Sequence, residues 1–594
     1  MTHSRTRRLV GVVAVAAAAA TVAATAGGTA SAAKNGPTMD IQLLSFNDFH
    51  GNLEPPTGSG GRLVVDHKID PATGKPVDVT QDAGGVEYLA NTLNTLRQGN
   101  PNSLTVAAGD LVGASPLLSA AFYDEPSIEA LNKLGLDASS VGNHEFDGGY
   151  KELQRKANGG CIDDGDGANN KNSCPAGTFT GADFDYLAAN VTYEGTDKTV
   201  LPPYSIKKIK GAKIGFIGMT LENTPNIVTA SGVAGLDFSD EVETANKLVP
   251  VLKKQGVNAI VVLVHEGGFP ASKQNWTAPD GTTYSVNANY DYTCQKGGVL
   301  SGPIVDIAGG LDPAIDMVVS GHTHAPYVCD VKDPAGQSRL VTSASSFGRL
   351  VTETNFKFDR RTKDIVRSSV TAKNVVVARD TKDAAQTALI AKYRELLGPI
   401  ASRVLGTVTT DVTRATNAGG ESPLGDLIAD AQLADPSVVT NGQTPVIAFM
   451  NPGGIRADVQ AGEVTFEDAF TVQPFNNFLV SLDLTGAQIK TLLTQQWSGV
   501  NAGAPKILQV SDGFAYTYSG TTLGSVTLNG QPIVDGQTYR VVTNNFLADG
   551  GDGFPVFTQA TNKYFGGLDI DAFANYLEAN SPYTPGPLDR ITKN

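Results

Sequence analysis

The sequence predicts an α/β protein with two domains, on three observations. The chain has 594 residues, more than one hydrophobic core usually supports. Through most of its length, short runs rich in β-branched residues, typical of buried strands, alternate with segments of helical spacing. A helix-like stretch without strands, residues 383–397, interrupts this alternation. We therefore expect a first domain over residues 38–370, a helical connector over residues 371–403 and a smaller α/β domain over residues 404–590.

The expected elements follow from these runs. In the first domain we expect buried strands at residues 41–46, 104–108, 214–219, 259–264 and 317–320. Helical spacing lies between them, at residues 87–97, 126–134 and 241–255. In the second domain we expect strands at 446–450, 478–482 and 539–543, and helices at 422–433 and 487–496. Two polar segments, interpreted as surface insertions, lie at 159–181 and 273–298.

Residues 1–32 have the pattern of a signal peptide. Three arginines come before an apolar run at residues 9–24, and the small-residue sequence ASA at residues 30–32 is typical of a cleavage site. The apolar run is short and poor in large side chains, which favours a cleaved signal over a membrane span. The adjacent Arg7 and Arg8 also resemble a twin-arginine signal, although we expect general secretory export. We therefore expect a secreted, extracellular protein without a stable membrane anchor.

Export makes the cysteines and the net charge informative. In an oxidising compartment the four cysteines are expected to form disulfides, for which three pairings are possible. Cys161–Cys174 is favoured because it closes a short loop, and Cys294–Cys329 then follows. The formal charge of −15 becomes −18 once the three arginines of the signal peptide are removed. Such an acidic chain is not expected to bind nucleic acid polymers, so an anionic substrate must be held by local positive charge.

Polar motifs follow the expected strands of the first domain. They read NDFHG at 47–51, GD at 109–110, GNHEFD at 142–147, VHE at 264–266 and GHTH at 321–324. Ligands of open α/β sheets bind beyond the carboxyl ends of the strands, where these motifs fall. Five of the seven histidines lie in them, together with two aspartates and an asparagine that offer metal-ligand atoms. This concentration indicates a metal site rather than scattered structural histidines.

Carboxylate oxygens mixed with imidazoles suit Mn²⁺, Zn²⁺, Co²⁺ or Fe rather than a cysteine-based structural zinc. Two divalent ions about 3.5–4 Å apart, bridged by a carboxylate, can clamp a phosphoryl group and generate hydroxide at neutral pH. We therefore expect two divalent metal ions and in-line attack of a metal-bound hydroxide on a phosphoryl group.

The ordered motifs resemble the calcineurin-like metallophosphoesterase family, and GNHEFD with NDFHG is similar to its 5′-nucleotidase branch. That branch includes UDP-sugar hydrolases and 2′,3′-cyclic-nucleotide phosphodiesterases. The resemblance implies a four-layer α/β/β/α sandwich. It also implies one metal held by Asp48, His50 and His324, a second held by Asn143, His265 and His322, and Asp110 bridging the two. In this family the histidine of GNHE is not a ligand, so His144 would stabilise charge on the phosphoryl or leaving-group oxygens, oriented by Asp147.

The second domain has its own loop motifs, NPGGIR at 451–456, QPFNN at 473–477 and NFLADGGDGF at 545–554. They resemble the C-terminal domain of the same family. The resemblance implies that Phe475 and Phe546 stack on the two faces of the base. It further implies ribose contacts from Asp552, polar contacts to the nucleoside from Asn451 and Asn477, and contacts to phosphate or ribose oxygens from Arg414 and Arg456. Some members carry a second arginine where this chain has Ala418, which weakens the expected contacts to terminal phosphates.

The sequence therefore predicts a secreted two-metal 5′-nucleotidase that releases nucleoside and phosphate. A 2′,3′-cyclic-nucleotide phosphodiesterase or UDP-sugar hydrolase of the same family is an open alternative. A binding protein with a degenerate metal site is disfavoured, because the ligand set and the His144/Asp147 pair are intact. The resemblance also implies that the second domain rotates to carry bound nucleotide to the metals.

Overall fold

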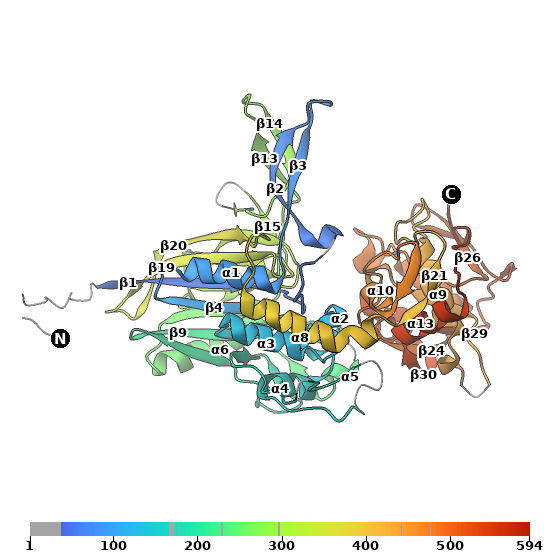
Figure 1. The fold of residues 1–594 in the computed structure, drawn as a ribbon, viewed down its shortest axis with the longest axis horizontal. Helices are drawn as coiled ribbons and strands as arrows, with labels where there is room; N and C mark the ends of the chain where they lie inside the picture. Colours follow the sequence, from blue (N-terminus) through green and yellow to red (C-terminus); the bar gives the residue numbers. More distant parts are fainter. Residues whose placement is uncertain are drawn as a thin grey trace, which may run out of the picture.

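The computed structural model describes residues 37–594, apart from residues 57, 165–170, 176, 227, 229, 295–297, 441 and 476. The signal peptide predicted at residues 1–32 lies outside the described residues. Figure 1 shows two bodies joined by one long helix, with a narrow arm rising from the first body. Within the described residues, no helix combines the length and the apolar character needed to cross a bilayer.

The first body contains two six-stranded sheets. One has the order β20-β19-β1-β4-β5-β6, and the other has the order β17-β18-β16-β11-β9-β8. The strands of the first sheet are β1 (Thr38–Phe46), β4 (Ser103–Ala108), β5 (Ala138–Ser140), β6 (Asp185–Leu187), β19 (Leu350–Asp359) and β20 (Asp364–Val376). Those of the second are β8 (Tyr204–Ile209), β9 (Ala212–Thr220), β11 (Ala259–His265), β16 (Met317–Ser320), β17 (Pro326–Lys332) and β18 (Ser338–Ala344).

Both faces of these sheets are buried, which explains the continuous apolar runs in the sequence. Successive side chains of a strand point to opposite faces, so Ile41 and Leu43 of β1 pack between the sheets against residues of β9 and β11. Leu44 and Phe46 of the same strand face outward, onto α1 (Val86–Arg97) and α3 (Glu125–Leu134). On the far side, α6 (Glu241–Lys254) and α7 (Pro303–Gly310) cover the second sheet. The predicted four-layer α/β/β/α arrangement is therefore confirmed.

The segment expected to be a helical connector contains α8 (Ala384–Ala401), which begins where the Asp383 side chain accepts the backbone N–H groups of Ala385 and Gln386. The helix is not a free linker. Its side chains Leu389, Ile390 and Tyr393 are buried in the same apolar cluster as α1 and α3. The long helix is thus packed along the first body for much of its length (Figure 1).

The two bodies meet at the end of α8. Arg394 donates hydrogen bonds to Glu54 of the first body and to Glu467 of α10 (Phe466–Val472) in the second. Phe466 and Phe470 of α10 continue the apolar cluster of the first body into the second. The junction is therefore partly apolar and partly ionic.

The second body is built on a five-stranded sheet of order β25-β22-β29-β24-β30. Its strands are β22 (Ile447–Met450), β24 (Phe478–Thr485), β25 (Gln509–Val510), β29 (Thr538–Asn544) and β30 (Thr561–Leu568). Packed around it are α9 (Pro423–Ala434), α11 (Gly486–Gln495) and α13 (Asp569–Ala579). A four-stranded sheet joins β26 (Phe514–Ser519), β27 (Thr522–Leu528), β28 (Gln531–Pro532) and β31 (Ile591–Lys593).

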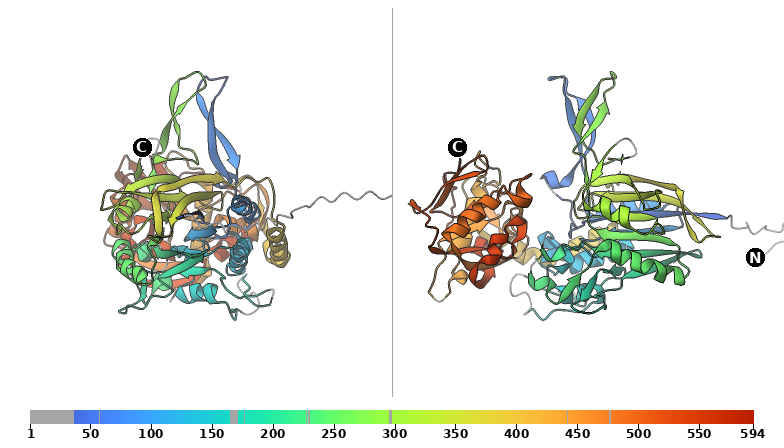
Figure 2. Two further views of the ribbon diagram at one scale, coloured as in Figure 1. Left: turned by 90° about the vertical axis from the view of Figure 1, so that its left-hand side faces the viewer. Right: turned by 180° about the vertical axis from the view of Figure 1, so that it is seen from behind.

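The arm consists of two hairpins, seen from three sides in Figures 1 and 2. They are β2 (Arg62–Ile69) with β3 (Pro76–Asp82), and β13 (Lys273–Thr277) with β14 (Thr283–Asn287). Asn287 Nδ2 donates to Asp78 Oδ2 at 2.7 Å and links the hairpins. The second hairpin lies in the predicted insertion at residues 273–298. Both favoured disulfides are present: Cys161–Cys174 closes a loop within the first predicted insertion, and Cys294–Cys329 links the second to β17.

Candidate active site

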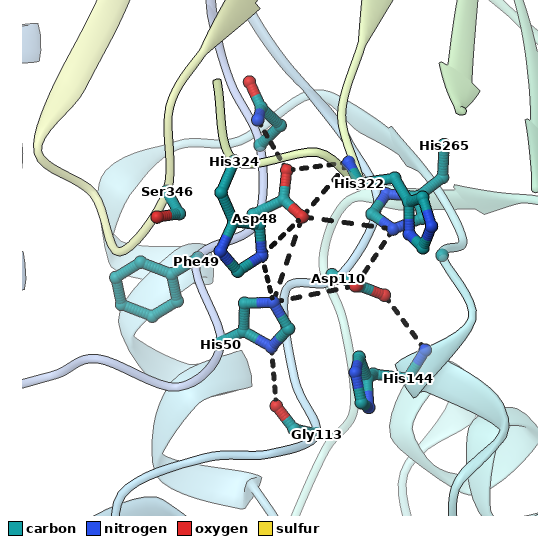
Figure 3. A network of polar contacts seen from close by, with 12 residues as sticks. Asp48, Phe49, His50, Asp110, Gly113, His144, His265, His322, His324 and Ser346 are labelled. Atoms are coloured by element: carbon teal, nitrogen blue, oxygen red, sulfur yellow. Dashed lines mark hydrogen bonds and ion pairs between the residues drawn. The ribbon is translucent and has the colours of Figure 1, made fainter. Parts of the chain in front are cut away.

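The predicted metal ligands converge at the carboxyl ends of the strands, between the two sheets (Figure 3). The chain turns sharply there, and five of these non-glycine residues have positive φ: Asp48, His50, Asp110, His322 and His324. Such conformations typically cost about 1–3 kcal/mol each and cluster at functional sites. The close approach of loops also requires glycine, because a Cβ on Gly321 would lie 3.0 Å from both Asp48 Oδ2 and His265 Nδ1.

One group of ligand atoms comprises Asp48, His50 and His324. His324 Nε2 lies 3.2 Å from Asp48 Oδ1 and 3.2 Å from His50 Nε2. The Nδ1 of His50 lies 2.8 Å from the carbonyl oxygen of Gly113, which fixes the ring with Nε2 facing the group. Burial lowers the pKa of His50 to about 3, so its imidazole is neutral and offers a lone pair.

The second group comprises Asp110, His265 and His322. His265 Nε2 lies 2.9 Å from Asp110 Oδ2, while its Nδ1 contacts the Ala108 carbonyl oxygen at 2.8 Å. The amide oxygen of Asn143 lies 3.1 Å from His322 Nδ1. Asp110 Oδ2 is also 3.6 Å from His50 Nε2, so this carboxylate lies between the two groups.

These residues fit divalent cations. The buried Nε2 of His265 is close to Asp110 Oδ2, at 2.9 Å, but makes no well-aligned hydrogen bond with any described residue, and His50 and His324 point ring nitrogens at one another. Imidazole lone pairs directed at a shared point satisfy one another poorly, but they match the ligand geometry of a metal ion. The donor set of imidazole nitrogens with carboxylate and amide oxygens suits Mn, Zn, Co or Fe.

His144 lies next to both groups. It opens a short helical turn, η2 (His144–Phe146), and its backbone N–H donates to Asp110 Oδ1 at 2.9 Å. Its ring Nδ1 lies 2.8 Å from Asp147 Oδ2. Burial lowers the pKa of His144, but the carboxylates of Asp147 and Asp110 outweigh it and raise that pKa to about 9. The ring also lies near His50 and Asp110, with which it forms a third group of potential metal-ligand atoms.

The second body brings one predicted residue directly to this site. The Phe475 ring lies 6.4 Å from the His144 ring, centroid to centroid, and is nearly parallel to it. On the Phe475 ring lies the guanidinium of Arg456, 5.8 Å from the centroid. Arg414 donates to the Arg456 carbonyl oxygen at 3.0 Å, which places the two predicted arginines side by side.

The other predicted substrate residues form separate contacts. Asn451 Nδ2 donates to Asp552 Oδ2 at 2.8 Å, and Asp552 has a positive φ of 56°. Asn477 Nδ2 instead donates to the buried Asp569, at 3.2 Å. Phe546 is half-buried and packs on Gly551, where a Cβ would lie 2.6 Å from the ring. Among the described residues, Phe475 and Phe546 make no direct ring contact.

Comparison with known proteins identifies the family to which the chain belongs. Residues 41–326 match the calcineurin-like phosphoesterase family, and residues 404–559 match the 5′-nucleotidase C-terminal domain. A cell wall protein of Listeria monocytogenes is 34% identical over 592 residues, which cover 93% of this chain and 68% of that protein. The chain belongs to the 5′-nucleotidase family of metal-dependent phosphoester hydrolases. The resemblance drawn from the motifs is therefore confirmed.

Other relatives differ in how much of their own length aligns with this chain. A 5′-nucleotidase of Vibrio cholerae is 26% identical, with 92% of this chain and 91% of that protein aligned. An endonuclease of Bacillus subtilis is 30% identical, but the match covers 91% of this chain and 40% of that protein. Among solved structures, a 5′-nucleotidase precursor from Thermus thermophilus has a TM-score of 0.65 at 25% identity, covering 93% of this chain and 99% of that one.

Two residues that contact predicted site residues were not themselves predicted from the sequence. Asn47 is buried, and its amide donates to Asp48 Oδ2 and to the Ser345 carbonyl oxygen, so it orients a predicted ligand. Its position in the NDFHG motif was the available signal. Lys506 donates to Asp552 Oδ1, on the carboxylate that also accepts from Asn451. No motif surrounds Lys506, so nothing in the sequence connected it to Asp552.

Proposed function

We propose that this protein is a secreted 5′-nucleotidase that hydrolyses nucleotide phosphate esters to nucleoside and phosphate with two divalent metal ions. One observation carries the proposal. Asp110 lies between two groups of metal-ligand atoms beside the His144/Asp147 pair, and the Phe475 ring of the second body lies 6.4 Å from the His144 ring. A substrate with a phosphoryl group at one end and a planar base at the other suits this arrangement.

Asp48, His50 and His324 would hold one ion, Asn143, His265 and His322 the other, with Asp110 between them. When bound, two such ions lower the pKa of a water molecule and neutralise charge on the phosphoryl oxygens. The chain supplies the framework, since the backbone carbonyl oxygens of Gly113 and Ala108 fix the rings of His50 and His265.

His144 would act on the phosphoryl side. Asp147 accepts from Nδ1, so the ring is held in one orientation and its positive charge is favoured. Nε2–H is then free to donate to a phosphoryl or leaving-group oxygen as negative charge develops there. A fixed donor of this kind costs no reorganisation during the reaction, which is why such donors accelerate it strongly.

The second body would bind the nucleoside. Phe475 and Phe546 would stack on the base, Asp552 would accept the ribose hydroxyls, and Asn451 and Asn477 would contact polar edges. Arg414 and Arg456 would contact phosphate or ribose oxygens. Asp552 is already held by Asn451 and Lys506, and each of its oxygens keeps a second lone pair for a hydroxyl. We also propose that the second body rotates about the junction of α8, where Arg394 joins both bodies.

Secretion rests on the predicted signal peptide and on the two disulfides, which persist in oxidising compartments. Fractionation of cells expressing the full chain tests it. Finding the mature protein in the medium and lacking residues 1–32 is expected, whereas an uncleaved protein retained in the cell would contradict it.

The substrate is tested with a panel of AMP, ADP, UDP-glucose, 2′,3′-cyclic AMP and 4-nitrophenyl phosphate, by chromatography of the organic products together with phosphate release, because opening a cyclic phosphate or cleaving a nucleotide sugar frees no inorganic phosphate. Enzyme stripped with a chelator is assayed with each divalent metal added back. Highest kcat/KM for nucleoside 5′-monophosphates is expected. A higher kcat/KM for the cyclic nucleotide or the nucleotide sugar would replace the proposal with one of the two alternative activities.

A further inference from the structure

A basic surface lies at the amino ends of the parallel strands of the first body. Two of its three segments adjoin the second sheet. The β8–β9 hairpin carries Lys208, Lys210 and Lys213, and the last turn of α6, which leads into β11, carries Lys253 and Lys254. The ammonium of Lys213 donates to the C-cap carbonyl oxygen of α6 at 2.8 Å, so the hairpin and the end of the helix lie side by side.

The third segment is the turn between β19 and β20, which carries Arg360, Arg361 and Lys363. The register of β19 against β1 places this turn beside the beginning of β1. Arg360 Nη1 donates to the Lys210 carbonyl oxygen at 3.4 Å, and Asn258 Nδ2 donates to a carbonyl oxygen of the turn at 2.6 Å. The three segments therefore form one surface, in which six of the eight cations are exposed and two are half-buried.

Other cations at this end of the first body are neutralised by carboxylates. Lys207 Nζ lies 2.8 Å from Asp185 Oδ2, and Lys357 Nζ donates to Asp40 Oδ1 at 2.7 Å. By contrast, none of the eight cations of the basic surface forms an ion pair with any residue that the structure describes. Their charge is therefore available to a partner.

The basic surface is strongly positive on an acidic chain. The turn and the start of β20 also hold the carboxylates of Asp359 and Asp364, so eight cations and two carboxylates give a local formal charge of +6, against −15 for the whole chain. Cations in the last turn of α6 stabilise that end of the helix. Lys208 and Lys213, however, lie directly opposite each other on β8 and β9, where like charges are destabilising. A surface that concentrates charge at a cost in stability is suited to an anionic partner.

The length of β11 separates the basic surface from the candidate active site. The strand begins at Ala259, just after α6, and ends at His265, a predicted metal ligand. Its 7 residues, at about 3.3 Å each, put about 20 Å between the two ends. Figures 1 and 2 show β1 entering the first body at the end that faces away from the second body. An anion bound at the basic surface therefore does not reach the predicted metal ligands, and the surface is suited to docking rather than to binding substrate.

We propose that the basic surface docks this protein on an anionic phospholipid bilayer. The place where the chain enters the domain favours a bilayer over a soluble polyanion. Arg360 N–H donates to the Pro37 carbonyl oxygen at 2.9 Å, so residue 37 lies at this surface. The apolar run of the predicted signal peptide, residues 9–24, precedes it by about 12 residues, which span at most about 40 Å. During export the bilayer is therefore the anionic surface nearest to these cations.

Docking by charge alone is reversible and needs no membrane-spanning segment. With the amino ends of the strands against the bilayer, the carboxyl ends face away from it. The candidate active site then stays open to substrates in the surrounding solution.

The experiment measures cosedimentation of the chain, without its predicted signal peptide, with lipid vesicles. Anionic vesicles contain phosphatidylglycerol and phosphatidylcholine in equal parts, and neutral vesicles contain phosphatidylcholine alone. The surface variant replaces one exposed cation in each segment, by Lys210→Gln, Lys254→Gln and Arg361→Gln. The control variant makes the same charge change at three exposed lysines on the arm and in β31, by Lys68→Gln, Lys75→Gln and Lys593→Gln. Melting temperatures report folding.

At about 0.1 M salt, wild type should sediment with the anionic vesicles and stay in solution with the neutral ones. Each cation held at an anionic bilayer contributes about fivefold to partitioning, so the surface variant should bind roughly a hundredfold more weakly. The control variant should bind as wild type does. Raising the salt to about 1 M, which shortens the screening length from about 10 Å to about 3 Å, should release wild type from the vesicles.

Equal losses in the surface and control variants would mean that net charge decides binding, and would overturn the proposal. Equal binding of wild type to neutral and anionic vesicles, or no binding to either, would overturn it too. Binding to soluble polyphosphate as tight as binding to the anionic vesicles, at the same phosphate concentration, would overturn the bilayer as the partner.

Discussion

Phe475 offers the most informative single substitution, because its ring faces His144, one of the two proposed catalytic residues, from the other body. It lies 6.4 Å from the His144 ring and under the Arg456 guanidinium. Stacking on one face of a base contributes about 1–3 kcal/mol, and each 1.4 kcal/mol is tenfold in affinity. Phe475→Ala should therefore lower kcat/KM for AMP about tenfold or more. Hydrolysis of 4-nitrophenyl phosphate, which needs only the metal ligands and His144, should change less than twofold.

The assay is steady-state phosphate release with both substrates, at metal saturation and with the melting temperature recorded. Phe565→Ala is the matched control, since Phe565 lies in the same body and is 57% exposed. It should leave both rates unchanged. Equal losses for the two substrates in Phe475→Ala would mean that the ring packs the junction rather than binding the base, and the proposed nucleoside grip would be wrong.

Three further predictions concern chemistry, stability and motion. His144→Asn should lower kcat by about 10²–10⁴-fold and leave metal content near two ions per chain; a loss of one ion, measured by elemental analysis, would make His144 a ligand. Burial raises the pKa of Asp569 to about 7, so the stability this group confers is present below pH 4 and is lost as pH rises to 7. Asp569→Asn should therefore melt about 2–4 °C above wild type at pH 8 but not at pH 4, and parallel melting curves at both pH values would refute this. A disulfide engineered across the junction should stop AMP turnover and restore it on reduction, whereas full turnover in the oxidised form would exclude rotation.

Much of the fold follows from the sequence for identifiable reasons. Strands such as β1 and β11 are apolar on both faces, because each lies in a sheet covered on both sides, and such runs are easy to recognise. The arm hairpins were harder, since β2 and β3 are largely polar and solvent-facing. The packing of α8 along the first body was also not predicted, because helical spacing does not show which surface a helix covers.

For the candidate site, too, some features could be predicted from the sequence and others could not. Motifs at strand ends predicted which residues converge, because parallel strands place their carboxyl ends at one edge. Hydrogen bonds between residues far apart in the chain have no local sequence pattern that would predict them. Lys506 and Asp552 are 46 residues apart, and Asn477 and Asp569 are 92 apart, so only the folded chain brings them together.

We propose that this protein hydrolyses nucleotides at a metal-dependent phosphoryl-transfer site. The most direct test is phosphate release from AMP by enzyme stripped with EDTA and verified as metal-free by elemental analysis, before and after addition of Mn²⁺, Co²⁺ or Zn²⁺. We expect no release without metal and restored release at about two ions bound per chain. Full release of phosphate by verified metal-free enzyme would contradict it.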